Sequence, residues 1–145
     1  MRILIVDDED VSRAKLKTLL ATYGDCDTAT NGSEALEMIK KASADGRPYM
    51  LMTMDISMPG MSGKEAVAAI RTWEQEKRLA GARIIMVTSS TDMLEISASM
   101  KAGCDGYLMK PFTPENIQET LDSLGIRLKL GLRLKRPPKP PGASG

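Results

Sequence analysis

The sequence predicts an α/β fold, a doubly wound five-stranded parallel sheet with helices on both faces. Three observations predict it: short apolar runs alternate with segments of helical periodicity, turn and capping residues bound them, and four runs end in a polar or ionisable residue. The alternation implies parallel strands joined by right-handed crossovers. Ligands of such sheets bind outside the carboxyl ends of the strands, so the four endings are expected to converge on one site.

In the first half of the chain, three strands alternate with two helices. Residues 2–6 are an apolar run, and the helix after it, ended by Gly24, has an apolar stripe at helical spacing: Leu16, Leu19, Leu20 and Tyr23. Residues 26–29 are scarcely apolar and are placed as a strand by their position between two helical segments. The next helix opens on a capping box of Asn31 with Glu34 and is expected to bury Ala35, Leu36 and Ile39. The apolar run 50–54 is the third strand.

The second half continues with three helices and two strands. Ser62 and Glu65 form a second capping box, ahead of the expected buried residues Val67, Ile70 and Trp73. After the apolar run 84–87, Asp92 is the expected N-cap of a helix closed by Gly103, with a poor apolar stripe of Met93, Ile96 and Met100. After the run 106–109, Thr113 and Pro114 are the expected N-cap and first residue of a last helix that carries Ile117, Leu121 and Leu124.

The residues at the strand ends predict a phosphoryl-transfer site. Asp7-Asp8 and Asp55 would bring three carboxylates together, and two unit charges about 4 Å apart repel by about 4 kcal/mol at an effective dielectric near 20. Such a cluster raises a pKa or gathers a cation, and oxygen ligands without His or Cys suit Mg²⁺. Lys110 adds a point charge and Thr88 a hydroxyl, both suited to a phosphoryl group beside an aspartate nucleophile.

Composition excludes several classes of function. A chain of 145 residues predicts one domain, and it has no signal-peptide layout and no run near the ~20 apolar residues of a transmembrane segment. Two cysteines form neither a disulfide framework nor a metal pattern, which favours a reduced, cytoplasmic setting. Residues 1–125 hold 14 basic and 19 acidic side chains, which argues against nucleic-acid contact by this part. The absence of histidine excludes imidazole catalysis and histidine metal sites.

Four blocks at the strand ends together resemble the signature of response-regulator receiver domains. The blocks are residues 3–9, 54–63, 87–89 and 107–112, and the likeness covers residues 2 to about 125. The resemblance implies a sheet in the order 2-1-3-4-5, as in the flavodoxin-like receiver fold. It also implies a phosphorylation-activated signalling domain of a two-component system or phosphorelay, rather than an enzyme that acts on separate substrates.

The resemblance assigns roles to the acidic residues. Asp55 would accept a phosphoryl group from a phosphohistidine on a partner protein. Asp8, Asp55 and the backbone carbonyl of Ser57 would ligate Mg²⁺, and Asp7 would act on the metal through water. Because the chain has no histidine, a histidine kinase or histidine phosphotransfer protein must supply the group.

The resemblance also implies a switch. Lys110 would pair with the phosphoryl oxygens, and Thr88 would move to bond one of them. Tyr107 would then change rotamer and reshape the surface made by the fourth helix, fifth strand and fifth helix, where a downstream effector protein would bind. The Lys110-Pro111 peptide would be cis.

Two other functions use related architectures. An aspartate-nucleophile phosphatase of the haloacid-dehalogenase type has a second Asp two residues after the nucleophile, where this chain has Ser57. A flavodoxin-type flavin domain needs a hydroxyl- and Gly-rich phosphate loop after the first strand. Here Asp7-Asp8-Glu9 would repel phosphate in the absence of metal.

Residues 126–145 differ from the domain expected over residues 1–125. They hold six basic and no acidic side chains, alternate apolar and polar residues over 126–135, and then contain four prolines. Three interpretations stay open: a solvated tail or linker remnant, an added strand at a sheet edge, or electrostatic adhesion to an acidic partner or membrane surface. Deleting 126–145 tests the second, because an unchanged oligomeric state rejects it.

Overall fold

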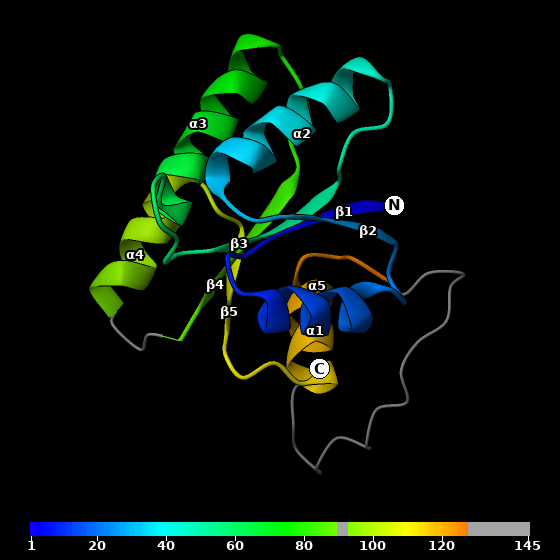
Figure 1. The fold of residues 1–145 in the computed structure, drawn as a ribbon, viewed down its shortest axis with the longest axis vertical. Coiled ribbons are helices and arrows are strands. Elements are labelled where there is room, and N and C mark those ends of the chain that lie inside the picture. Colours follow the sequence, from blue (N-terminus) through cyan, green and yellow to red (C-terminus); the bar gives the residue numbers. More distant parts are fainter. Residues whose placement is uncertain (90–92, 128–145) are drawn as a thin grey trace.

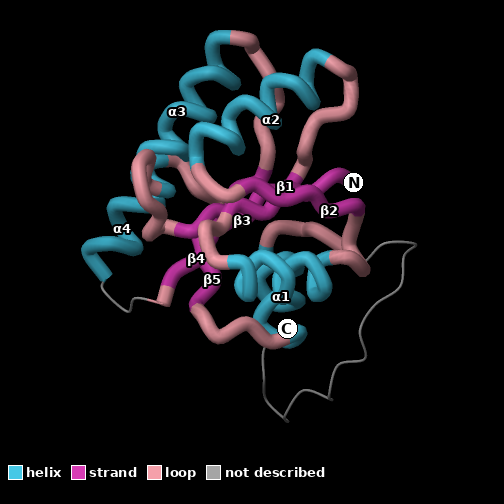
Figure 2. The backbone as a smooth tube through the Cα atoms, viewed as in Figure 1, coloured by secondary structure: helices cyan, strands magenta, loops and turns pink. Residues whose placement is uncertain are grey.

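A computed structural model describes residues 1–89 and 93–127, and it contains the expected doubly wound sheet (Figures 1 and 2). Five parallel strands lie in the order β2-β1-β3-β4-β5, which confirms the predicted order. Their bounds are β1 Arg2–Val6, β2 Asp25–Ala29, β3 Leu51–Asp55, β4 Arg83–Thr88 and β5 Gly106–Met109. The strand that was predicted from position alone, β2, is present and pairs with β1 along its whole length.

The helices cover both faces of the sheet. Their bounds are α1 Asp10–Leu20, α2 Gly32–Ala44, α3 Gly63–Glu76, α4 Met93–Ala102 and α5 Pro114–Ser123. Figure 2 shows α2 and α3 on one side of the magenta strands and α1 and α5 on the other, and α3 contacts both α2 and α4. Among the described residues, no helix combines the length and the apolar character that crossing a membrane requires.

Three predicted helix starts are confirmed by side-chain caps. Each cap oxygen accepts the amide three residues further on, at 2.8, 3.2 and 3.1 Å, and the caps are Asn31, Ser62 and Thr113. Only one of the two bonds of the capping box at Asn31 is present. The Glu34 carboxylate accepts hydrogen bonds from the Thr30 hydroxyl and amide instead of from the Asn31 amide. Asp92 lies outside the described residues, and Gly103 follows α4 with a φ of +114°.

The predicted end of the first helix is wrong. Helix α1 ends at Leu20, before the turn that leads to Gly24. Tyr23 is buried in the same core but reaches it from this turn, where its amide donates to the Leu20 carbonyl at 2.9 Å. The turn is packed against the start of the chain, since a Cβ at Gly24 would lie 2.2 Å from the Met1 carbonyl oxygen. The spacing of Tyr23 therefore matches a helix only by coincidence.

The sheet divides the apolar interior into two clusters. Along β1, Leu4 and Val6 join the cluster beneath α2 and α3, whereas Ile3 and Ile5 join the cluster beneath α1 and α5. This alternation follows from the period-2 geometry of a strand whose two faces are both covered. Burying an aliphatic side chain of this size contributes about 1.5–3 kcal/mol, so both clusters hold the strand ends in place.

A partly buried ion-pair network ties the amino-terminal ends of β4 and β5 to α3. The Arg71 guanidinium donates to Glu74 Oε1, to Asp105 Oδ2 and to the Gly103 carbonyl, each at 2.8 Å. The other Glu74 oxygen accepts the Ala82 amide at 2.8 Å. The network lies at the amino-terminal ends of the strands, opposite the site at their carboxyl ends, and the sequence patterns did not predict it.

The described chain ends on a compact turn after α5. Gly125 has a φ of +77°, and the Ile126 amide donates to the Leu121 carbonyl at 2.9 Å. Ile126, the first residue of the predicted tail, is half-buried against the α1 and α5 cluster. Residues 128–145 lie outside the described residues, together with most of the predicted alternating pattern and the prolines.

Candidate functional site

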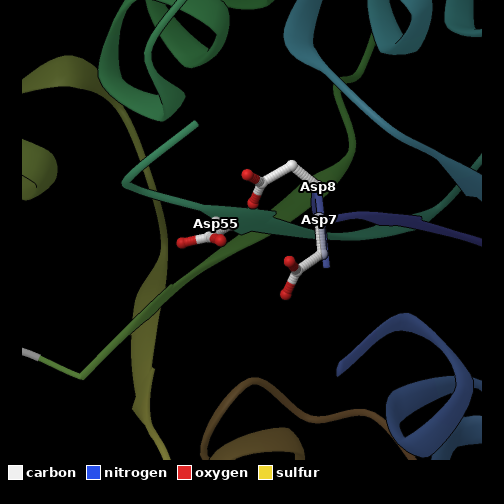
Figure 3. A group of neighbouring side chains, drawn as sticks. All are labelled: Asp7, Asp8 and Asp55. Carbon is white, nitrogen blue, oxygen red and sulfur yellow. The ribbon is translucent and has the colours of Figure 1, made fainter. Parts of the chain in front are cut away.

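Three carboxylates meet at the carboxyl ends of β1 and β3. Asp7 and Asp8 follow β1, Asp55 is the last residue of β3, and these neighbouring strands pair in register up to Val6 and Met54. One carboxylate oxygen from each of the three acids lies within 4.8 Å of the others, and Figure 3 shows them gathered at this edge. Asp7 and Asp55 are 1% and 5% exposed, whereas Asp8 is exposed. The structure therefore confirms the prediction that these three carboxylates lie close together.

Asp7 is held by three hydrogen bonds that leave one oxygen directed into the site. Its amide donates to the Ala29 carbonyl at 3.1 Å, its Oδ1 accepts the Glu9 amide at 2.9 Å, and its carbonyl accepts from Arg13 Nη1 at 2.8 Å. The remaining oxygen, Oδ2, is buried and has no hydrogen-bond partner within the described part of the chain. Lys110 Nζ lies 3.5 Å from it as a counter-charge.

Asp55 is a buried acid with a raised pKa. Burial first, and then the negative charge of Asp7, raise the pKa of Asp55 to about 6 against the opposing effects of Lys110 and of the Ser57 amide. That amide donates to Asp55 Oδ1 at 3.1 Å. Behind the acid, a Cβ at Gly63 would lie 2.2 Å from the Asp55 carbonyl oxygen, so the start of α3 packs directly on the end of β3.

Lys110 reaches across the edge of the sheet to the acids. It follows β5, and its ammonium lies 3.8 Å from Asp55 Oδ2 and 3.4 Å from Glu9 Oε1. Burial lowers the pKa of Lys110, but the carboxylates of Asp55, Asp7 and Glu9 together outweigh it and raise the pKa above its usual value. Lys110 therefore stays charged at neutral pH. The Lys110-Pro111 peptide is cis, as the resemblance implied.

Thr88 and Tyr107 lie on the two neighbouring strands at this edge. Thr88 is the buried last residue of β4, and its carbonyl accepts the Lys110 amide at 2.8 Å. Tyr107 lies on β5 opposite Met86 and is 44% exposed. The switch roles of both residues, and that of the Ser57 carbonyl as a ligand, stay predictions.

The donor set fits a hard divalent cation. All three groups are carboxylates, the cluster contains neither His nor Cys, and the Asp7 Oδ2 atom is buried without a hydrogen-bond partner among the described residues. Mg²⁺ prefers oxygen ligands from one or two carboxylates and keeps several waters, which the exposed side of Asp8 allows. Asp7, Asp8 and Asp55 are therefore the residues that could hold such an ion.

Two residues of the site were missed by sequence reasoning. Glu9 supplies a third carboxylate for Lys110, and Arg13 bonds the loop that carries Asp7. Both lie in or just after the Asp-Asp-Glu segment, where a charged residue usually faces solvent. Glu9 lies in the block 3–9 that carries the resemblance, but nothing in that block assigned it a contact with Lys110, and no periodic or motif signal distinguished Arg13 from an exposed charge.

An acidic pocket with a lysine lies at the carboxyl ends of a doubly wound parallel sheet, as the resemblance to receiver domains implied. The chain belongs to the response regulator receiver domain family, whose model matches residues 3–122. Receiver domains of this CheY-like kind act in chemotaxis and other two-component systems, and they interact with histidine kinases or phosphotransfer proteins.

Individual relatives agree with this assignment. The chain is 37% identical over 130 residues to chemotaxis protein CheY-3 of Vibrio cholerae, covering 88% of this chain and 94% of that protein. The structure of Vibrio cholerae CheY4 is similar with a TM-score of 0.73 and 32% identity, covering 84% of this chain and 96% of that one. A chain in the co-crystal structure of the Saccharomyces cerevisiae phosphotransfer protein Ypd1 with the receiver domain of Ssk1 is similar with a TM-score of 0.72 and 27% identity, covering 84% and 87%.

Proposed function

We propose that the chain is a phosphorylation-controlled switch in which Asp55 is the phosphoacceptor. The observation that carries the proposal is the position of Asp55, a buried carboxylate with Asp7 and Asp8 beside it and Lys110 Nζ at 3.8 Å. Two further acids and one ammonium around a single carboxylate have no obvious structural use, because three carboxylates outnumber the one ammonium and the cluster costs electrostatic free energy until a further cation binds. They are, however, the groups that phosphoryl transfer requires.

The proposed reaction uses the ionised form of Asp55. One carboxylate oxygen forms a bond to the phosphorus of a phosphohistidine on a partner, the P–N bond breaks, and the electron pair remains on the imidazole nitrogen. With a pKa of about 6, Asp55 is mostly ionised at neutral pH and can act as the nucleophile. The Lys110 ammonium, already directed at Asp55, balances charge on the transferred oxygens.

The proposed metal site consists of Asp8, Asp55 and the Ser57 carbonyl, with Asp7 acting through water. When bound, Mg²⁺ would neutralise charge on the acceptor and on the phosphoryl oxygens. The buried Oδ2 of Asp7 supports this assignment, because it needs a water or a cation to satisfy it.

The proposed donor is a histidine kinase or a histidine phosphotransfer protein. The chain has no histidine and cannot carry a phosphohistidine itself. The structural likeness to a chain in a co-crystal of Ypd1 with a receiver domain supports a donor of this kind. A cytoplasmic location, without nucleic-acid contact by residues 1–125, is part of the same proposal. Residues 126–145 remain a proposed tail or linker.

The proposed output surface consists of α4, β5 and α5, and it would change when Thr88 and Tyr107 respond to the phosphoryl group. Helix α4 buries Ile96 and Ser99, and the exposed apolar side chains on α4 and β5 are Met93, Leu94, Met100 and Tyr107. Exposed apolar side chains on these two elements, together with a helix that buries few residues, support a downstream effector protein as the partner.

Phosphorylation by a small acyl-phosphate donor with Mg²⁺ tests the proposed function. We expect a base-labile label on the wild-type chain and none on Asp55→Ala. Glu37→Gln, an exposed change on α2, is the matched control and should be labelled like the wild type. A label that persists in Asp55→Ala would remove Asp55 as the acceptor, and turnover of phosphate esters without a stable label would favour the phosphatase alternative.

A further inference from the structure

Arg13 lies on α1 but directs its guanidinium back to the loop before that helix. Its Nη1 donates to the Asp7 carbonyl at 2.8 Å, and its Nη2 pairs with the exposed carboxylate of Asp10. The Arg13 side chain is 16% exposed, far less than a solvated surface arginine. The i,i+3 pair with Asp10 stabilises the helix, but it does not explain why the other end of the guanidinium is directed at the Asp7 carbonyl.

The Asp7 carbonyl belongs to the rigid peptide unit that joins Asp7 to Asp8. Fixing the direction of this carbonyl therefore fixes the orientation of the peptide plane, which contains the Cα atoms of both Asp7 and Asp8. The Ala29 carbonyl holds the Asp7 amide, and the Glu9 amide holds Asp7 Oδ1. Arg13 is therefore the residue that holds the Asp7 carbonyl. Of these three bonds, it is the one in which the partner of Asp7 is a side chain, so a substitution of that partner can remove it.

Repulsion among the three carboxylates tends to move the loop that carries Asp7 and Asp8 away from Asp55. The three carboxylates lie within 4.8 Å of one another, and rotation of the Asp7–Asp8 peptide would separate them. A loop free to rotate would spend less time with its carboxylates close enough to share one cation, and the cation would bind more weakly.

We infer that Arg13 is a positioning residue for the divalent-cation site. It holds the Asp7–Asp8 peptide so that both carboxylates stay beside Asp55, and it contacts neither the cation nor the phosphoryl group. This inference rests on the proposed function, because it assumes that a cation binds at these acids.

Magnesium titration of Arg13 variants, followed by backbone amide NMR, tests the inference. Arg13→Met should raise the Kd for Mg²⁺ about 10-fold or more, the range found when groups that orient metal ligands are removed. Arg13→Lys keeps the charge and can donate one hydrogen bond, so it should recover part of this loss. In the metal-free protein, the amide resonances of Asp8 and Glu9 should shift or broaden in Arg13→Met.

Two control variants separate positioning from charge. Asp10→Asn removes the other partner of the Arg13 guanidinium, and Lys17→Met removes an exposed positive charge from the same helix. Each should change the Kd less than about twofold, because exposed pairs and screened charges contribute little. If Lys17→Met weakens binding as much as Arg13→Met does, net charge is the cause and the inference is wrong.

The outcomes also separate this inference from the proposed function. Wild-type protein that binds no Mg²⁺ and accepts no phosphoryl group would overturn the proposed function. Wild-type protein that binds Mg²⁺, with Arg13→Met binding equally well, would overturn only the role of Arg13. If Arg13→Met fails to fold in thermal unfolding, Arg13→Lys decides: a Kd equal to that of the wild type, with unshifted amides at Asp8 and Glu9, contradicts positioning by the guanidinium.

Discussion

Replacing Asp55 with Asn removes one of three neighbouring negative charges, which the single ammonium of Lys110 balances only in part. Asn has nearly the same shape and keeps an oxygen that can accept the Ser57 amide, so packing at the end of β3 should not change. Burial, with the charge of Asp7, raises the pKa of Asp55 from 3.8 to about 6. This difference corresponds to about 3 kcal/mol of unfolding free energy, which the folded protein loses when Asp55 is ionised. We therefore expect Asp55→Asn to be more stable than the wild type at pH 7 by up to about 3 kcal/mol.

The pH dependence gives the sign of the effect. The folded protein binds a proton at Asp55 more tightly than the unfolded chain does, so the stability contributed by this group falls as the pH rises from 3.8 to about 6. Between pH 7 and pH 5 the advantage of Asp55→Asn should decrease to about half, because the wild-type acid becomes protonated. Comparing the two proteins at each pH cancels the effect of carboxylates that do not interact with Asp55.

Urea unfolding of wild type, Asp55→Asn and the surface control Glu37→Gln measures this effect at both pH values, with and without Mg²⁺. Glu37→Gln should change the unfolding free energy by less than about 0.5 kcal/mol. Saturating Mg²⁺ should shrink the advantage of Asp55→Asn, because the ion stabilises the wild type by binding its folded state. If Asp55→Asn is less stable than the wild type at pH 7 without metal, the electrostatic account of the site is refuted.

Three further predictions concern stability. The buried Thr53 Oγ1 has no hydrogen-bond partner among the described residues, so Thr53→Val should gain about 1 kcal/mol in urea unfolding; a loss would mean that the hydroxyl is satisfied. Tyr49 donates to Asp27 at 2.7 Å, and this bond is the largest cause of the lowered pKa of Asp27. Tyr49→Phe should therefore lose about 1 kcal/mol above pH 3.8, and the loss should vanish as the pH falls through the lowered pKa of Asp27; a loss that does not depend on pH would contradict it. Arg71→Met leaves Glu74 buried without its cation and should lower the free energy of unfolding by about 3 kcal/mol. Adding Glu74→Gln in a double variant should restore part of this loss. A loss below about 1 kcal/mol would show that Glu74 is well solvated.

The sequence allowed the main site to be predicted because its residues stand at the ends of recognisable strands. Asp7, Asp55 and Lys110 come directly after apolar runs, and parallel strands bring those ends to one edge whatever the loops do. Even β2 could be placed, since an alternating α/β order requires a strand between the first two helices. The fold and the convergence of the acids thus follow from local pattern and topology.

Contacts that depend on the path of a loop could not be predicted. Arg13 reaches Asp7 six positions earlier, and Arg71 reaches Asp105 across two elements, neither of which is a helical or strand spacing. Tyr23 gives the opposite error, because its spacing is helical although the residue lies in a turn. Charged residues in such positions look like solvated surface residues until the tertiary structure brings their partners close.

The sheet also determines which substitutions can compensate for one another. Leu4 and Ile3 are adjacent in the chain, yet their side chains belong to separate apolar clusters with the strand backbone between them. Volume removed from one cluster can be refilled only by a neighbour in the same cluster, so paired substitutions on opposite sides should have additive effects on unfolding and pairs on one side should not. The two halves of the interior are therefore free to diverge independently during evolution, provided that the shared strands keep their alternation.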